Sequence, residues 1–120
     1  MREWLRAELV RLGNTCRWSR EGWRAAWATE KSLRQWTVVN VASAGLALSL
    51  DLTAGERALI LALGLMVLVA ELVNSALEDA VDYISTARDP RAKRIKDIGS
   101  AAVAVAALAG GVAWVAILIG

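Results

Sequence analysis

The sequence predicts an all-α membrane protein, with one amphipathic N-terminal helix followed by three transmembrane helices. Hydrophobic residues make up 57% of the 120 residues, yet the chain has one proline and no phenylalanine. This composition favours helices joined by short connections over long linkers. The apolar residues gather in three segments, and the basic residues gather outside them. A chain of this length is expected to form a single domain.

The three apolar segments differ in length and polarity. Residues 99–120 carry no charge and are long enough to cross a bilayer, because about 20 apolar residues span its hydrocarbon core. Residues 58–80 are also long and end in acidic side chains. Residues 36–52 are shorter and contain hydroxyl groups and Asn40, which favours packing inside a helix bundle. We predict a transmembrane helix in each segment.

The distribution of basic residues predicts the orientation in the membrane. Of 14 Lys and Arg residues, eight precede Trp36 and five lie in the predicted loop 83–97, whereas Arg57 alone lies between the first two spans. Positive charge marks the cytoplasmic side. We therefore expect a multi-pass membrane protein with the N-terminus and loop 83–97 in the cytoplasm and the C-terminus outside. The first 30 residues lack the continuous apolar core of a cleaved signal peptide.

Residues 1–34 have the pattern of an interfacial amphipathic helix. Apolar residues recur at helical spacing, and arginines share another face, which suits a helix in the headgroup region. Asn14 and Thr15, which follow Gly13, predict a break that divides this helix into two. The apolar stripe runs through Trp23 and Trp27 to Glu30, where an apolar residue is expected. A helix that only anchors the protein remains an alternative, but it has no need of this carboxylate.

Helix ends are also encoded. Thr53 and Glu56 have capping-box spacing, and Asp89 followed by Pro90 predicts an N-cap and first helical residue. Asp51 and Arg57 are most simply interpreted as solvated loop charges.

An acidic face interrupts the second span. Glu71, Asn74, Glu78 and Asp82 stand at i, i+3, i+7 and i+11, so on a helix they share one face, with Ser75 beside them. Glu71 and Glu78 are then about 10 Å apart along the axis. Ionisable side chains within a membrane span usually mark function.

The available side chains restrict the chemistry. The chain has no histidine, one cysteine and no glycine-rich phosphate-binding loop, which excludes a histidine relay, a cysteine-rich metal site and a P-loop. Phosphoryl transfer needs only carboxylates, cations and a divalent metal. Glu30 and Glu78 are predicted at similar depth and could share one Mg²⁺, while Lys96 could hold a phosphate that Asp97 orients. Two alternatives remain: a structural polar seam, and a proton-coupled transporter that uses Glu71 as its proton site.

Three runs of sequence carry a more specific signal. They are 25–35 (AAWxxExxxRQ), 71–82 (ELVNSALExxVD) and 92–103 (AKxxKDxGSAAV). In this order they resemble the signatures of the prokaryotic diacylglycerol kinase family over nearly the whole chain. The resemblance implies a homotrimer in the bacterial inner membrane, with an active site at a subunit boundary. It implies transfer of the γ-phosphate of Mg-ATP to diacylglycerol, giving phosphatidic acid. Related enzymes phosphorylate undecaprenol, which is the alternative lipid.

The resemblance also implies roles for individual residues. Glu71 matches the proton acceptor, and Glu30 and Glu78 match the metal ligands. The positions implied to bind ATP, some of them shared with the metal, are Arg11, Trp18, Glu30, Asn74, Glu78, Ala87, Arg88, Asp89, Lys96 and Asp97. Those implied to contact the lipid are Arg11, Arg34, Ser49, Leu50, Asp51, Leu52, Arg57, Glu71 and Ser100. Trp18 stands where the family commonly has an ATP-contacting tyrosine.

Overall fold

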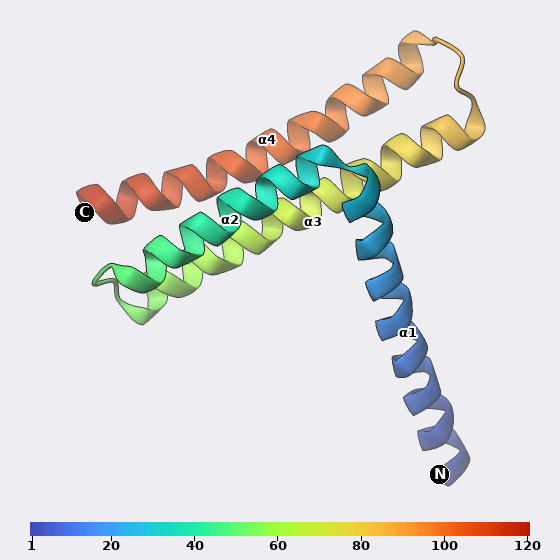
Figure 1. Cartoon of the computed structure of the whole chain (residues 1–120), viewed down its shortest axis with the longest axis horizontal. Coiled ribbons are helices and arrows are strands. Elements are labelled where there is room, and N and C mark those ends of the chain that lie inside the picture. Colours follow the sequence, from blue (N-terminus) through green and yellow to red (C-terminus); the bar gives the residue numbers. More distant parts are fainter. The chain divides into compact units, whose positions relative to one another are not determined.

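The computed structural model describes all 120 residues and consists of four helices. They are α1 (Arg2–Thr29), α2 (Lys31–Ser49), α3 (Ala54–Ile84) and α4 (Pro90–Ile119) (Figure 1). The prediction of an all-helical chain is confirmed. The helices form two compact units, Met1–Glu30 and Lys31–Gly120, and each unit is described by itself.

The first unit is one continuous helix. The predicted break after Gly13 is wrong, because α1 runs through it without interruption. A single glycine costs a helix only about 1 kcal/mol, and the Thr15 hydroxyl donates to the Arg11 carbonyl (2.9 Å) within the helix. Trp23 and Trp27 lie on one face with stacked rings, 5.9 Å between centroids. The helix ends earlier than the predicted segment 1–34, because Glu30 adopts extended backbone angles.

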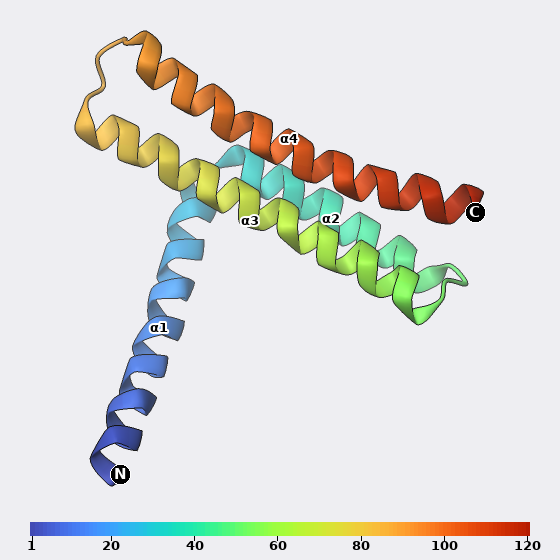
Figure 2. The same cartoon turned by 180° about the vertical axis from the view of Figure 1, so that it is seen from behind.

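The second unit has α3 in contact with both other helices (Figure 2). The predicted capping box begins α3: the Glu56 amide donates to the Thr53 hydroxyl (3.2 Å), and the Thr53 amide donates to the Glu56 carboxylate (2.9 Å). Arg57 does not behave as a solvated loop charge. Its guanidinium donates to the carbonyls of Ala47 (3.0 Å) and Leu50 (3.3 Å), so it satisfies acceptors that the end of α2 leaves open.

The predicted loop 83–97 is mostly helical. The helix α3 continues to Ile84, and α4 begins at Pro90 behind Asp89 as its N-cap, as the sequence predicts. The Asp89 carboxylate accepts hydrogen bonds from the Arg91 side chain (2.7 and 3.1 Å) and the Arg91 amide (2.8 Å). These bonds hold the pKa of Asp89 below its usual value. Basic residues predicted in a loop therefore line the first turns of α4.

Two helices are long and apolar enough to cross a membrane: α3, with 31 residues, and α4, with 30. The helix α2, with 19 residues, is less apolar and does not meet the same criterion. Large apolar side chains on α4 stay exposed in this chain, among them Val105, Leu108 and Val112. These faces are suited to contact with lipid or with other apolar helices.

Hydrogen bonds of polar side chains connect the three helices of the second unit inside the apolar region. The Asn40 amide donates to the Gly64 carbonyl (2.8 Å) and joins α2 to α3, while the Trp114 indole donates to the Ser43 hydroxyl (2.8 Å) and joins α4 to α2. Gly64 allows the first contact, because a Cβ at this position would collide with Oδ1 of Asn40.

We expect Gly64→Ala to destabilise the fold by about 1–2 kcal/mol, because the new methyl group displaces Asn40 and breaks its hydrogen bond to α3. The free energy of unfolding in mixed detergent micelles measures the effect. In an Asn40→Ala background the obstacle is gone, so the same glycine substitution should cost much less. An equal cost in both backgrounds would contradict this explanation.

Candidate active site

The polar face of α3 is buried. Glu71, Asn74 and Ser75 are 5%, 9% and 6% exposed, respectively. They follow a long apolar stretch of α3. Because α3 is helical throughout, Glu78 and Asp82 continue the same face toward the end of the helix. Polar groups that are buried in an apolar helix are costly, which makes this face the candidate catalytic surface.

Asn74 is oriented by its neighbours. Its amide nitrogen donates to the Glu78 carboxylate over 3.4 Å. Its amide oxygen is buried and has no hydrogen-bond partner. Gly99 on α4 lies directly against this oxygen, and a Cβ there would collide with it. A buried acceptor without a partner is unusual in a folded protein. Asn74 therefore presents an unused acceptor beside a carboxylate.

We expect Gly99→Ala to lower the phosphate transfer that the sequence predicts by about tenfold or more while changing stability little. The side-chain end of Asn74 can swing away from the new methyl group, but it then leaves Glu78, and small misplacements at reacting centres are costly in rate. Gly110→Ala is the matched control, since a Cβ there meets no atom within 4 Å. Equal activity of the two variants would contradict the role of Gly99.

An open pocket of about 560 Å³ lies where α3 leads into α4. We call it the hairpin pocket. It is lined by Asp82 and Ser85–Asp89, by Pro90 and Ala92, and by Lys93, Lys96 and Asp97. Five of the residues implied to bind ATP are among these: Ala87, Arg88, Asp89, Lys96 and Asp97. The structure thus brings together residues from the loop and from the first turns of α4.

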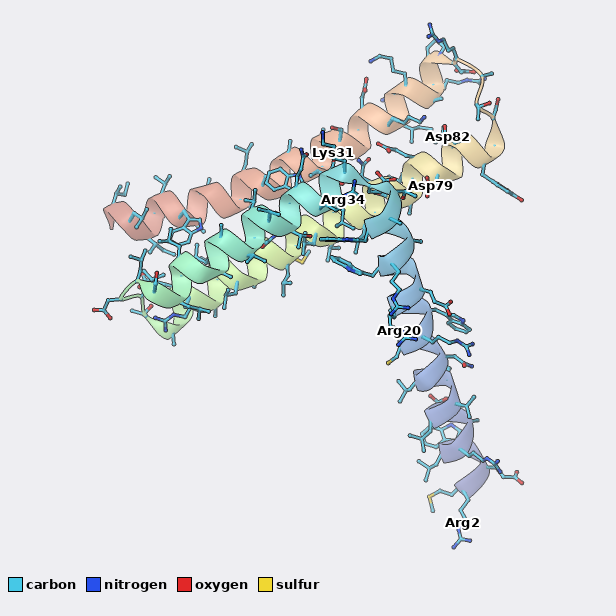
Figure 3. The ribbon with its side chains drawn as sticks, in the orientation of Figure 1. Arg2, Arg20, Lys31, Arg34, Asp79 and Asp82 are labelled. Atoms are coloured by element: carbon cyan, nitrogen blue, oxygen red, sulfur yellow. The ribbon has the colours of Figure 1, made fainter.

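The charged groups of this region are arranged in pairs. Lys96 Nζ donates to Asp82 Oδ1 (2.8 Å), and Lys93 Nζ donates to Asp97 Oδ2 (2.6 Å). The hydrogen bond to Asp82 raises the pKa of Lys96, which lies ahead of the uncharged segment 99–120. Figure 3 shows Asp79 and Asp82 on the last turns of α3, near the loop that leads into α4. The hairpin pocket thus offers lysine and arginine side chains, with their carboxylate partners, to an anionic ligand.

Two interhelical contacts show how far along the helix axes the residues implied to contact the lipid lie. Asn40 meets Gly64 and Gly99 meets Asn74. Because neighbouring helices run antiparallel with the same rise, Arg34 and Ser100 lie at nearly the same depth as Glu71. The three positions therefore lie on three different helices of the second unit, at nearly the same height along the helix axes.

The turn between α2 and α3 lies at the other end of the unit. It holds Ser49, Leu50, Asp51 and Leu52, followed by Arg57. The 14 positions from Arg57 to Glu71 correspond to about 20 Å along α3. A lipid that contacts this turn and also presents its hydroxyl to Glu71 must therefore lie along α3, with the turn at its tail.

Arg11, Trp18 and Glu30 belong to the first unit. Arg11 lies 2.8 Å from Glu8 in an exposed ion pair, Trp18 is exposed, and Glu30 is partly buried at the end of α1. The prediction that Glu30 and Glu78 share a cation therefore stays a prediction, because these residues belong to different units.

The donor atoms on α3 suit magnesium. No three acidic, histidine or cysteine side chains gather into a closed metal site. Magnesium does not need one, because it commonly takes one or two carboxylates and completes its octahedron with waters and substrate phosphates. Glu78 supplies a carboxylate, and the unpartnered oxygen of Asn74 lies in the same turn. These hard oxygen donors fit Mg²⁺ bound together with a phosphate.

Comparison with known proteins decides among the possible classes. Residues 17–118 match the family model described as prokaryotic diacylglycerol kinase. The chain belongs to the prokaryotic diacylglycerol kinase family. This places the buried Glu71 of α3 in a family of kinases and argues against the transporter hypothesis.

Relatives in this diacylglycerol kinase family span nearly the same length. A diacylglycerol kinase of Pseudomonas aeruginosa is 43% identical over 112 residues, covering 93% of this chain and 91% of the relative. One from Escherichia coli K12 is 36% identical over 101 residues (84% and 83%). One from Haemophilus influenzae is 34% identical over 110 residues (92% and 93%). Together with membership of this family, the apolar helices α3 and α4 indicate a location in the bacterial membrane.

Some features of the site were missed from the sequence. Asp82 was placed on the acidic face, but its pairing with Lys96 across the loop was not predicted. Lys93 was not selected either, although its spacing of four from Asp97 is that of a helical ion pair. The close approach of Gly99 to Asn74 has no local sequence signal, because it depends on how α3 and α4 pack.

Proposed function

We propose that this protein is a lipid kinase that transfers the γ-phosphate of Mg-ATP to the hydroxyl of diacylglycerol, which yields phosphatidic acid and ADP. The observation that carries the proposal is the polar face of α3, with buried Glu71 and Asn74 and half-buried Glu78, in a chain of this family. The name diacylglycerol kinase, shared by the relatives described above, favours diacylglycerol over undecaprenol.

Glu71 is the proposed proton acceptor. The lipid hydroxyl oxygen attacks the γ-phosphorus, the bond from that phosphorus to the oxygen bridging to the β-phosphate breaks, and the hydroxyl proton passes to the Glu71 carboxylate. A base for this step must meet an alcohol that arrives from the bilayer. Glu71 is suited to it because it lies in the apolar part of α3, about 10 Å deeper than Glu78.

The hairpin pocket and the adjoining turns of α3 are the proposed nucleotide site. Lys96 and Arg88 would neutralise phosphate charge, Asp97 would hold Lys93 beside them through its 2.6 Å hydrogen bond, and Asn74 would accept a hydrogen bond near the transferred group. Ala87 and Asp89 would cover the nucleotide from the loop. Glu78, with Glu30 of the first unit, would hold Mg²⁺, which when bound supplies charge neutralisation to the phosphates. Arg11 and Trp18 are proposed to complete the ATP contacts.

Lipid contacts are proposed at two levels. Arg34 and Ser100 lie near the depth of Glu71 and would meet the glycerol region, together with Arg11 from the first unit. Ser49, Leu50, Asp51, Leu52 and Arg57 are about 20 Å or more away from that depth along α3 and would meet the acyl tails.

The proposed membrane arrangement has three crossings and three copies of the chain. The helix α2, with 19 residues, is about 28 Å long, close to the thickness of the hydrocarbon core. The exposed apolar faces of α4 offer surface for neighbouring copies. The basic N-terminal unit and the basic turns around Arg88–Lys96 would face the cytoplasm, where ATP is found, with the C-terminus outside and α1 at the membrane surface.

A phosphate-transfer assay tests the proposal. Purified protein in mixed micelles receives radiolabelled ATP, Mg²⁺, and diacylglycerol and undecaprenol side by side. We expect labelled phosphatidic acid as the main product, and none without Mg²⁺. Labelled undecaprenyl phosphate as the main product would change the assigned lipid, and no labelled lipid at all would overturn the proposed activity.

A further inference from the structure

The ion pair between Asp82 and Lys96 differs from its neighbours. It joins side chains 14 positions apart, from the last turns of α3 and the first turns of α4. The other two pairs, Arg91 with Asp89 and Lys93 with Asp97, connect residues at most four positions apart. The Asp82–Lys96 pair therefore fixes one lysine relative to both walls of the hairpin pocket.

Lys96 retains capacity for a second ligand in this arrangement. An ammonium group has three donors, and the contact with Asp82 uses one of them. The lysine stem is flexible and samples many rotamers when nothing holds its head. An anchor on one donor limits that freedom and leaves the remaining donors for an anion in the pocket, where Arg88 and Lys93 are also found.

Two effects of Asp82 on a bound phosphate oppose each other. Its negative charge repels the phosphate, but the side chains of Asp82 and Lys96 are 51% and 37% exposed, so water screens that repulsion. The contact between Lys96 Nζ and Asp82 Oδ1 is direct, at 2.8 Å, whereas a phosphate bound by the other donors of Lys96 would lie farther from Asp82, so water screens this contact less than the repulsion. The orienting effect is therefore expected to exceed the repulsion.

We propose that Asp82 is a positioning residue that holds Lys96 in the hairpin pocket for the phosphates of the nucleotide. This inference rests on the proposed function. Asp82 acts through Lys96, so its removal should affect nucleotide binding and leave lipid binding unchanged.

The test compares three variants in micelles. Asp82→Ala should raise the KM for MgATP by about tenfold, within the range of coupling between contacting residues, with kcat and the KM for diacylglycerol nearly unchanged. Asp82→Asn should give an intermediate KM, because its amide oxygen still accepts a hydrogen bond. Asp79→Ala is the matched control: it removes the same charge from an exposed position one turn earlier that does not line the pocket.

A Lys96→Met background completes the test. There the Asp82→Ala substitution should no longer change the affinity for MgATP, measured by calorimetric titration of the micellar protein. If Asp82→Ala lowers the KM for MgATP, or matches Asp79→Ala, the positioning role is wrong although the kinase activity stands. If the unaltered protein transfers no phosphate from ATP, it is the proposed function that fails.

Discussion

Replacement of Glu71 by glutamine is expected to reduce phosphate transfer by about 10²–10⁴-fold, the range in which a positioned general base contributes. The amide has nearly the shape of the carboxylate but cannot take the proton of the attacking hydroxyl. Because Glu71 is 5% exposed within an apolar stretch of α3, the neutral glutamine should be tolerated by the fold. Initial rates of phosphatidic acid formation at saturating MgATP measure the effect.

Two controls separate a chemical from a structural effect. Glu71→Gln should bind MgATP with unchanged affinity and keep the thermal stability of the original protein. Ser75→Ala alters a neighbouring buried residue on the same face, 6% exposed, and should retain most of the activity. A Glu71→Gln protein with ordinary turnover would remove Glu71 from the mechanism.

The fold follows from local signals to a large extent. The capping box at Thr53 and the N-cap at Asp89 lie where their residue types predict, because each is a short-range hydrogen-bond pattern. One error arose from a weak local signal. Asn14 and Thr15, which follow Gly13, do not end α1, because such residues cost a helix only a small free energy.

The site follows from sequence only in part. The helical period places Glu71, Asn74 and Glu78 on one face, and no tertiary information is needed for that. The unpartnered oxygen of Asn74 and its contact with Gly99 depend on the distance between α3 and α4. The same holds for Arg57, whose hydrogen bonds to the end of α2 require that helix to return beside α3. Contacts between helices are set by packing, and packing leaves no periodic pattern in a single sequence from which it could be predicted.

Replacement of Glu78 by glutamine is expected to raise the Mg²⁺ concentration needed for half-maximal activity by about tenfold or more, because a neutral amide is a much weaker ligand for this hard cation. Glutamine keeps an oxygen that can accept the hydrogen bond from Asn74, now 3.4 Å long, so the neighbouring turn should hold its shape. Magnesium titrations of the initial rate at fixed ATP measure the shift.

The same titration distinguishes a metal ligand from a general charge effect. Asp79→Asn removes one negative charge from the adjacent, exposed position and should leave the magnesium requirement unchanged. Glu30→Gln should shift it as Glu78→Gln does if both carboxylates hold one ion, even though they belong to different units of the chain. If only Glu78→Gln shifts the magnesium requirement, Glu78 and Asn74 remain as the protein's oxygen donors. If neither substitution shifts it, the ion is held by the nucleotide phosphates without these side chains.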